Sequence, residues 1–106
     1  MFARKVSMHL KPNSLAEFTK RIEKDVLPLL RKQKGFQDEI TCVTTGEKEA
    51  FGISLWETRE NAETYNRGPY AEVTKFLTGL VEGTPQVETY EVSNSTFHKI
   101  AAAVAV

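Results

Sequence analysis

Four side chains in this 106-residue sequence could take part in chemistry on a small organic molecule. His9 is the candidate catalytic base, because an imidazole titrates near neutral pH and can accept a proton from an acidic hydroxyl. Trp56 would stack on an aromatic ring and the hydroxyl of Tyr65 would orient an oxygen atom on it, while Tyr70 is a further candidate for lining the site. The ordinary alternative is a surface or core histidine with an ordinary hydrogen bond, and a Trp56 and Tyr65 that simply pack in the core. Together these residues predict a binding site for a small apolar or aromatic molecule.

The segment Ala50–Thr58 indicates where that molecule would lie. Bulky and small residues alternate here, so a strand would have one bulky face and one nearly empty face that ends at Trp56. The small residues are Ala50, Gly52 and Ser54. If helices cover the empty face, the space above Gly52 and Ser54 would accept a flat apolar molecule.

Composition argues against several other classes of site. Fourteen basic residues balance fourteen acidic ones without any clustering, so neither nucleic acid nor a membrane surface is an expected partner. Cys42 is the only cysteine, which excludes an internal disulfide and a multi-cysteine metal site. His9 and His98 have no metal-binding spacing, and we expect no metal. The first ten residues do not resemble a signal peptide, which predicts a cytoplasmic protein.

The first half of the chain predicts a strand, a helix and a second strand. Residues 2–10 alternate as a strand does, with Phe2 and Arg4 on the side expected to face the core. Ser14 and Glu17 form a capping box, and apolar residues then recur at helical spacing up to Gly35, a left-handed helix end. Pro28 predicts a break in that helix. A strand over 36–45 follows, with a polar turn that makes a hairpin with strand 50–56.

The second half predicts a divided helix and a last strand. Thr58 is placed to cap a helix that Gly68-Pro69 interrupts, and helical spacing resumes from Tyr70 to Val81. The segment Gly83-Thr84-Pro85 is expected to end it, before a strand over 86–95.

This βαββαβ order predicts an α+β, ferredoxin-like fold in which a four-stranded antiparallel sheet carries both helices on one face. The opposite face would expose apolar residues, so a second copy is expected to cover it as a homodimer. The fold would occupy residues 1–100 as one domain. Residues 101–106 form an apolar tail, which is too short for a membrane span and is expected to be frayed or loosely docked.

Three motifs carry a resemblance to a known family, and they span nearly the whole chain. They are Leu10-Lys11-Pro12, Lys34-Gly35-Phe36, and Leu55-Trp56-Glu57-Thr58-Arg59-Glu60-Asn61-Ala62 followed by Tyr65. With them, the chain resembles the dimeric α/β-barrel proteins of the antibiotic biosynthesis monooxygenase superfamily. Members usually carry an acid two positions before this tryptophan, where the present chain has Ser54.

The resemblance implies a cofactor-independent monooxygenase that acts on a phenol, quinol or polyketide-type aromatic. A haem-degrading role is not expected, because the asparagine that such relatives carry on strand one is missing. The alternative is a non-catalytic dimer that binds a small molecule, which would account for Ser54. A third reading, an isomerase-like or dehalogenation-like activity, would turn over without consuming oxygen.

Overall fold

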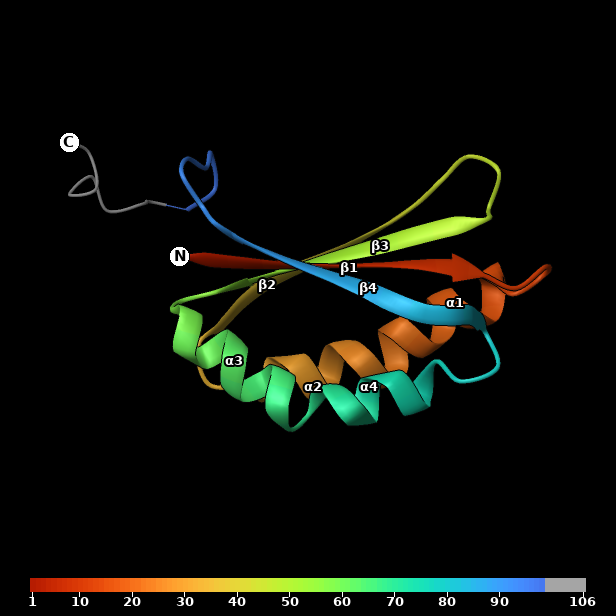
Figure 1. Cartoon of the computed structure of the whole chain (residues 1–106), viewed down its shortest axis with the longest axis horizontal. Coiled ribbons are helices and arrows are strands. Elements are labelled where there is room, and N and C mark those ends of the chain that lie inside the picture. The colour runs from red at the N-terminus through yellow and green to blue at the C-terminus, as the bar shows by residue number, and fades with distance from the viewer. Residues whose placement is uncertain (99–106) are drawn as a thin grey trace.

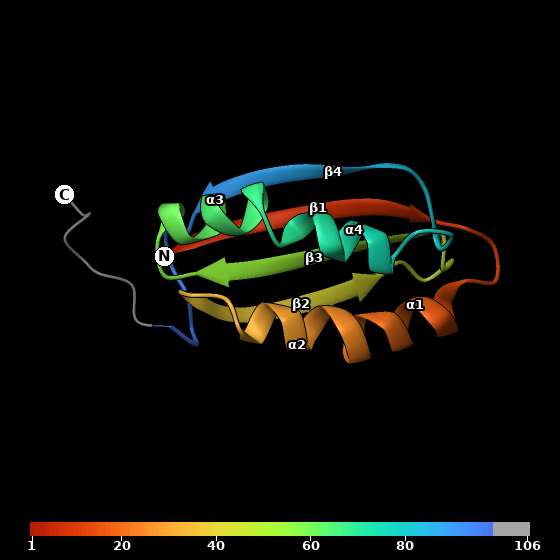
Figure 2. The same ribbon diagram turned by 90° about the horizontal axis from the view of Figure 1, so that it is seen from below.

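The computed structural model describes residues 1–98, which form an antiparallel sheet with every helix on one face (Figures 1 and 2). The strands lie in the order β2-β3-β1-β4, so β1 is central and β4 is an edge. This confirms the predicted α+β, ferredoxin-like arrangement of four strands. The elements are β1 (Phe2–Leu10), α1 (Leu15–Arg21), the π-helical segment η1 (Ile22–Val26), α2 (Leu27–Arg31), β2 (Phe36–Val43), β3 (Glu49–Trp56), α3 (Arg59–Arg67), α4 (Tyr70–Phe76) and β4 (Val81–Glu91).

The core lies between the helices and the inner face of the sheet. Along β3, Ala50, Ser54 and Trp56 are buried on that side, as the alternation predicted. Phe18 of α1 and Trp56 are completely buried and are the largest side chains sealed from solvent. Bulky residues pointing inward from the helices thus meet small residues of β3, and a space is left between them.

The predicted break at Pro28 is present as a change in helix type. Proline has no amide proton, so it cannot bond the carbonyl four residues earlier. The chain compensates with η1, in which the amide of Leu27 bonds the carbonyl of Ile22, five residues back. Regular helix then resumes through Arg31 and ends before Gly35, whose φ of +80° is the predicted left-handed conformation.

The two predicted helix caps differ in outcome. Thr58 is extended, and its hydroxyl accepts a 3.1 Å hydrogen bond from the amide of Asn61, as expected of an N-cap. The prediction of a capping box at Ser14 was wrong. Ser14 has helical dihedral angles and makes no side-chain cap, while Glu17 pairs with Arg21 one turn later at 3.1 Å.

The predicted boundary between the last helix and the last strand was also wrong. Helix α4 ends at Phe76, and β4 already begins at Val81, so the expected loop at 83–85 lies inside the strand. The register with β1 shifts between Ser7 and His9, and residues 83–85 form this bulge. Gly83 supplies a positive φ of +70°, and an edge strand tolerates Pro85, which lacks an amide proton.

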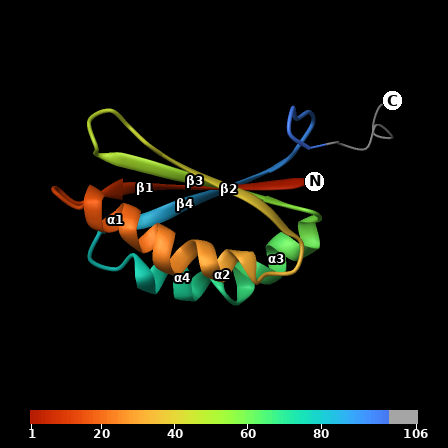
Figure 3. The same ribbon diagram turned by 180° about the vertical axis from the view of Figure 1, so that it is seen from behind.

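Beyond β4, the chain turns back over the outer face of the sheet (Figure 3). There Nε2 of His98 contacts the carboxylate of Asp38 of β2. Within residues 1–98, no helix is long and apolar enough to cross a membrane. The predicted apolar tail at 101–106 lies outside the described residues.

Gly35 offers a test of this packing. An added Cβ would lie 2.1 Å from Oδ1 of Asn61 and would also hold an unfavourable positive φ. We expect Gly35→Ala to lower the free energy of unfolding in urea by about 1–3 kcal/mol. Gly46→Ala is the control, because its Cβ would meet nothing within 4 Å. Equal stability of the two variants would contradict the described join between α2 and β2.

Candidate functional site

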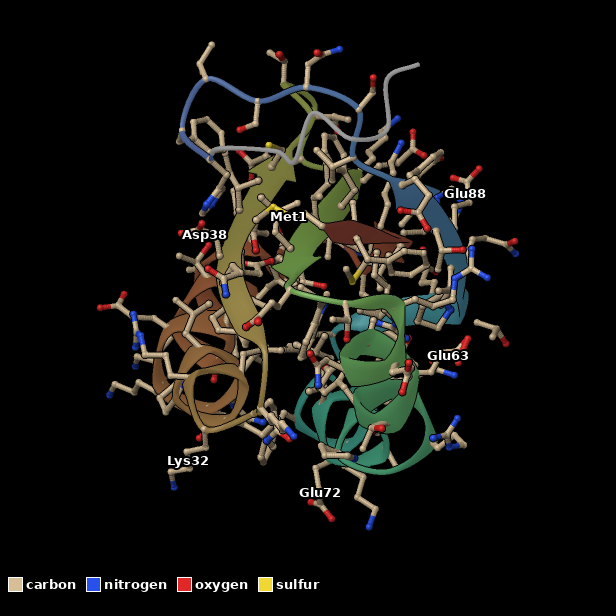
Figure 4. The ribbon with its side chains drawn as sticks, turned by 90° about the vertical axis from the view of Figure 1, so that its left-hand side faces the viewer. Met1, Lys32, Asp38, Glu63, Glu72 and Glu88 are labelled. Atoms are coloured by element: carbon tan, nitrogen blue, oxygen red, sulfur yellow. The ribbon has the colours of Figure 1, made fainter. Side chains whose placement is uncertain are left out.

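A cavity of about 550 Å³ lies between the inner face of the sheet and the helices. Figure 4 shows the two helical stretches side by side beneath the sheet, with Lys32 and Glu72 on the side away from it. This volume falls in the range of small-molecule sites. Its walls include Val6 and Met8 of β1, Ile22 and Val26 of η1, Tyr65 of α3, Tyr70, Val73 and Leu77 of α4, and Gly83, Thr84 and Pro85 of the β4 bulge.

Three polar residues form a row across the sheet wall of the cavity. In the strand register, Ser54 of β3 pairs with Glu39 of β2 on one side and with Arg4 of β1 on the other. All three line the cavity. Adjacent strands lie about 4.8 Å apart, so the backbones of Glu39 and Arg4 are separated by about 10 Å. The site therefore has an acidic end and a basic end.

Glu39 occupies the space that Gly52 leaves open. A Cβ on Gly52 would come within 2.7 Å of the Glu39 carboxylate, which accepts a 2.8 Å hydrogen bond from the Thr41 hydroxyl. Burial raises the pKa of Glu39 above 4.5, and the Thr41 bond offsets only part of that rise. A carboxyl group in this state is suited to accepting a proton from a ligand hydroxyl.

Arg4 is a buried cation, with only 3% of its surface exposed. Its Nη2 donates a 2.7 Å hydrogen bond to Oδ1 of Asn66. The guanidinium carbon lies 4.1 Å from the ring centre of Tyr70 and 5.3 Å from that of Tyr65, which are cation–π distances. Among residues 1–98, no carboxylate forms an ion pair with it.

Of the predicted ligand-binding residues, the structure brings Tyr65 and Tyr70 to the cavity, with ring centres 6.0 Å apart. Burial raises the pKa of Tyr65 well above its ordinary value, so its hydroxyl stays protonated at neutral pH. Trp56 lies behind Tyr65, at 5.0 Å between ring centres, and is fully buried. Its indole N–H donates a 2.9 Å bond to Ser54 Oγ. Trp56 therefore supports the wall, and Tyr65 covers the face on which a ligand was expected to stack.

His9 lies away from the cavity. Odd-numbered residues of β1 point to the outer face, and the His9 side chain is 70% exposed, with Nδ1 3.7 Å from Glu49. A catalytic role for His9 stays a prediction, and the geometry lends it no support. Glu39 and Arg4 are among the lining residues that sequence reasoning did not assign to the site. Within residues 1–98, no three potential metal ligands cluster together.

No family model matches the sequence, and no curated protein matches it either. Several solved structures share its fold. One is the monooxygenase ActVA-Orf6 of Streptomyces coelicolor in complex with nanaomycin D, with 17% identity over 89% of this chain and 88% of that one, and a TM-score of 0.76. Another is SnoaB, a cofactor-independent oxygenase of Streptomyces nogalater, with 11% identity over 90% and 95%, and a TM-score of 0.74. The protein has the antibiotic biosynthesis monooxygenase fold.

This fold also occurs without an assigned activity. The NE2512 protein of unknown function from Nitrosomonas europaea is 18% identical to this chain, with a TM-score of 0.75. The match covers 95% of this chain and 94% of that protein. At these identities the likeness establishes the architecture alone.

The raised pKa of Glu39 predicts a pH-dependent stability. The folded state keeps this proton at pH values where the unfolded chain has lost it, so stability falls as pH rises from 4.5 through the folded pKa. We expect Glu39→Gln to raise the thermal midpoint by a few degrees at pH 8 and by less at pH 5. Glu57→Gln, at an exposed position beyond β3, is the control. A Glu39→Gln variant that is less stable at both pH values would contradict this assignment.

Proposed function

We propose that this protein is a cofactor-independent monooxygenase acting on a small phenolic or quinol-type aromatic molecule in the cavity between sheet and helices. The observation that carries the proposal is Glu39, a carboxyl of raised pKa that lines a cavity walled by Tyr65 and Tyr70. The oxygenases that share the fold support the same class of chemistry.

The reaction needs a base and oxygen, and the substrate supplies all the electrons. A phenol first loses its hydroxyl proton to Glu39, which makes the ring electron-rich. The ring carbon para to the oxygen then bonds to O2. Cleavage of the O–O bond and loss of the hydrogen on that carbon leave a carbonyl there. A phenol and O2 thus give a quinone and water, with four electrons passing from the ring to oxygen.

The remaining residues of the wall orient the ring. Tyr65 keeps its proton at neutral pH, so its hydroxyl can donate a hydrogen bond to the oxygen of the substrate. Tyr70 and Val6 bound the space that the ring would occupy. Trp56 acts as a positioning residue, because it holds Tyr65 without reaching the cavity.

A non-catalytic small-molecule binder is the second candidate. It is favoured by Ser54, which stands where the resembling family usually carries an acid and whose hydroxyl is engaged by Trp56. In that case, the cavity would hold an aromatic molecule without turnover. Oxygen consumption separates the two candidates.

The homodimer is a further part of the proposal. Ile53 and Leu55 of β3 face away from the helices, and Ile40 of β2 beside them is 60% exposed. Packing a second sheet on this face would bury the apolar patch. Phe51, Val92 and Tyr90 extend it across the strands.

Oxygen uptake with 1-naphthol tests the monooxygenase. We expect the wild type to convert the naphthol and O2 into 1,4-naphthoquinone and water, and Glu39→Gln to lower the rate about 10²-fold or more. The rate of the wild type should rise with pH through the raised pKa of Glu39, because the base must be ionised. Glu57→Gln is the control and should keep the wild-type rate. Binding of the naphthol without uptake would instead identify the non-catalytic binder.

Ile53→Glu tests the dimer, because it places a charge at the centre of the outer face. We expect the wild type to sediment as a dimer and this variant as a folded monomer with unchanged circular dichroism. Lys24→Glu, on the exposed side of η1, is the control and should remain dimeric. A monomeric wild type at micromolar concentration would overturn the proposed assembly.

A further inference from the structure

The Arg4 side chain has N–H donors that no residue of the described chain uses, and these donors are available to a ligand. A guanidinium carries five N–H donors, and Asn66 accepts from one of its nitrogens. Every fully buried side-chain polar atom of residues 1–98 has a hydrogen-bond partner. Any nitrogen of Arg4 without a partner therefore borders open space, and Arg4 lines both the cavity and a smaller pocket beside Asn66.

The charge of Arg4 is also not neutralised from within the described chain. Glu39 lines the same cavity two strands away and Glu63 lines a smaller pocket with Arg4, but no ion pair joins either carboxylate to Arg4. An adjacent guanidinium would lower the pKa of the Glu39 carboxyl, whereas it is raised. The two tyrosines stabilise the cation through their ring faces and bring no negative charge. A buried cation in this setting strongly favours a bound anion.

We propose that the molecule bound in the cavity is an aromatic hydroxy acid, with its carboxylate on Arg4 and its hydroxyl directed at Glu39. This deepens the proposed function and rests on it for the role of the hydroxyl, whereas the carboxylate contact stands on Arg4 alone. Ser54 lies between the two ends on β3, and Gly52 and Val6 line the cavity one step further along their strands. A two-ring aromatic acid matches the proposal, because its two polar groups lie on opposite rings and the backbones of Arg4 and Glu39 are about 10 Å apart.

The test compares 5-hydroxy-2-naphthoate with 5-hydroxy-2-naphthamide, which has the same rings and hydroxyl but no charge. By calorimetry at pH 7, we expect the wild type to bind the acid at least 10-fold more tightly than the amide, as a charge-assisted bond requires. Arg4→Met should lose this preference while still binding the amide. Arg59→Met is the control, because Arg59 is exposed and lies over Phe2 outside the cavity.

The comparison of acid and amide in the wild type remains decisive even if Arg4→Met does not fold. Equal affinity for the two compounds, or an unchanged preference in Arg4→Met, would overturn the inference. Oxygen uptake is recorded on the same compounds. Equal affinity for the acid and the amide, with oxygen uptake on both, would leave the monooxygenase standing and refute the carboxylate contact. Tight, Arg4-dependent binding of the acid without uptake would support the contact and refute the monooxygenase.

Discussion

The burial of a positive charge in the central strand is the constraint on which the rest of the site depends. Removing a guanidinium from water costs several kcal/mol unless other groups replace the lost hydration. Here the replacements come from different elements: Tyr65 and Asn66 from α3, and Tyr70 from the start of α4. The bend at Gly68-Pro69 brings both tyrosine rings to the same guanidinium. The interrupted helix is therefore part of the site and not only a connection.

Much of the fold could be predicted because each element repeats one simple pattern. Strand alternation placed Ala50, Ser54 and Trp56 on the inner face correctly, and helical spacing with Pro28 located the interruption of the first helix. The last strand could not be placed in the same way. Gly83 and Pro85 are typical of a loop, and only a bulge on an edge strand accommodates both within a sheet.

The candidate site was harder to predict, because its polar residues meet only through strand register. Glu39 and Ser54 are fifteen positions apart in the sequence and become neighbours when β2 pairs with β3. Strand alternation placed Glu39 and Asp38 on opposite faces of the sheet. It could not show which of the two side chains points toward the helices. The carboxylate of Glu39 thus lies on the strand next to Ser54, the position at which the resembling family usually carries an acid. His9 drew attention by its residue type, although its odd position on β1 directs it outward.

The strand order has a consequence for how the chain folds. Strand β1 is completed on one edge by β3 and on the other by β4, so Phe2 pairs with both Trp56 and Glu91. The β2–β3 hairpin can form locally, whereas the β1–β4 ladder must close a loop across most of the described chain. A nascent chain that has not yet produced β4 leaves one edge of its central strand unpaired. During synthesis this edge is the surface most open to association with other unfinished chains.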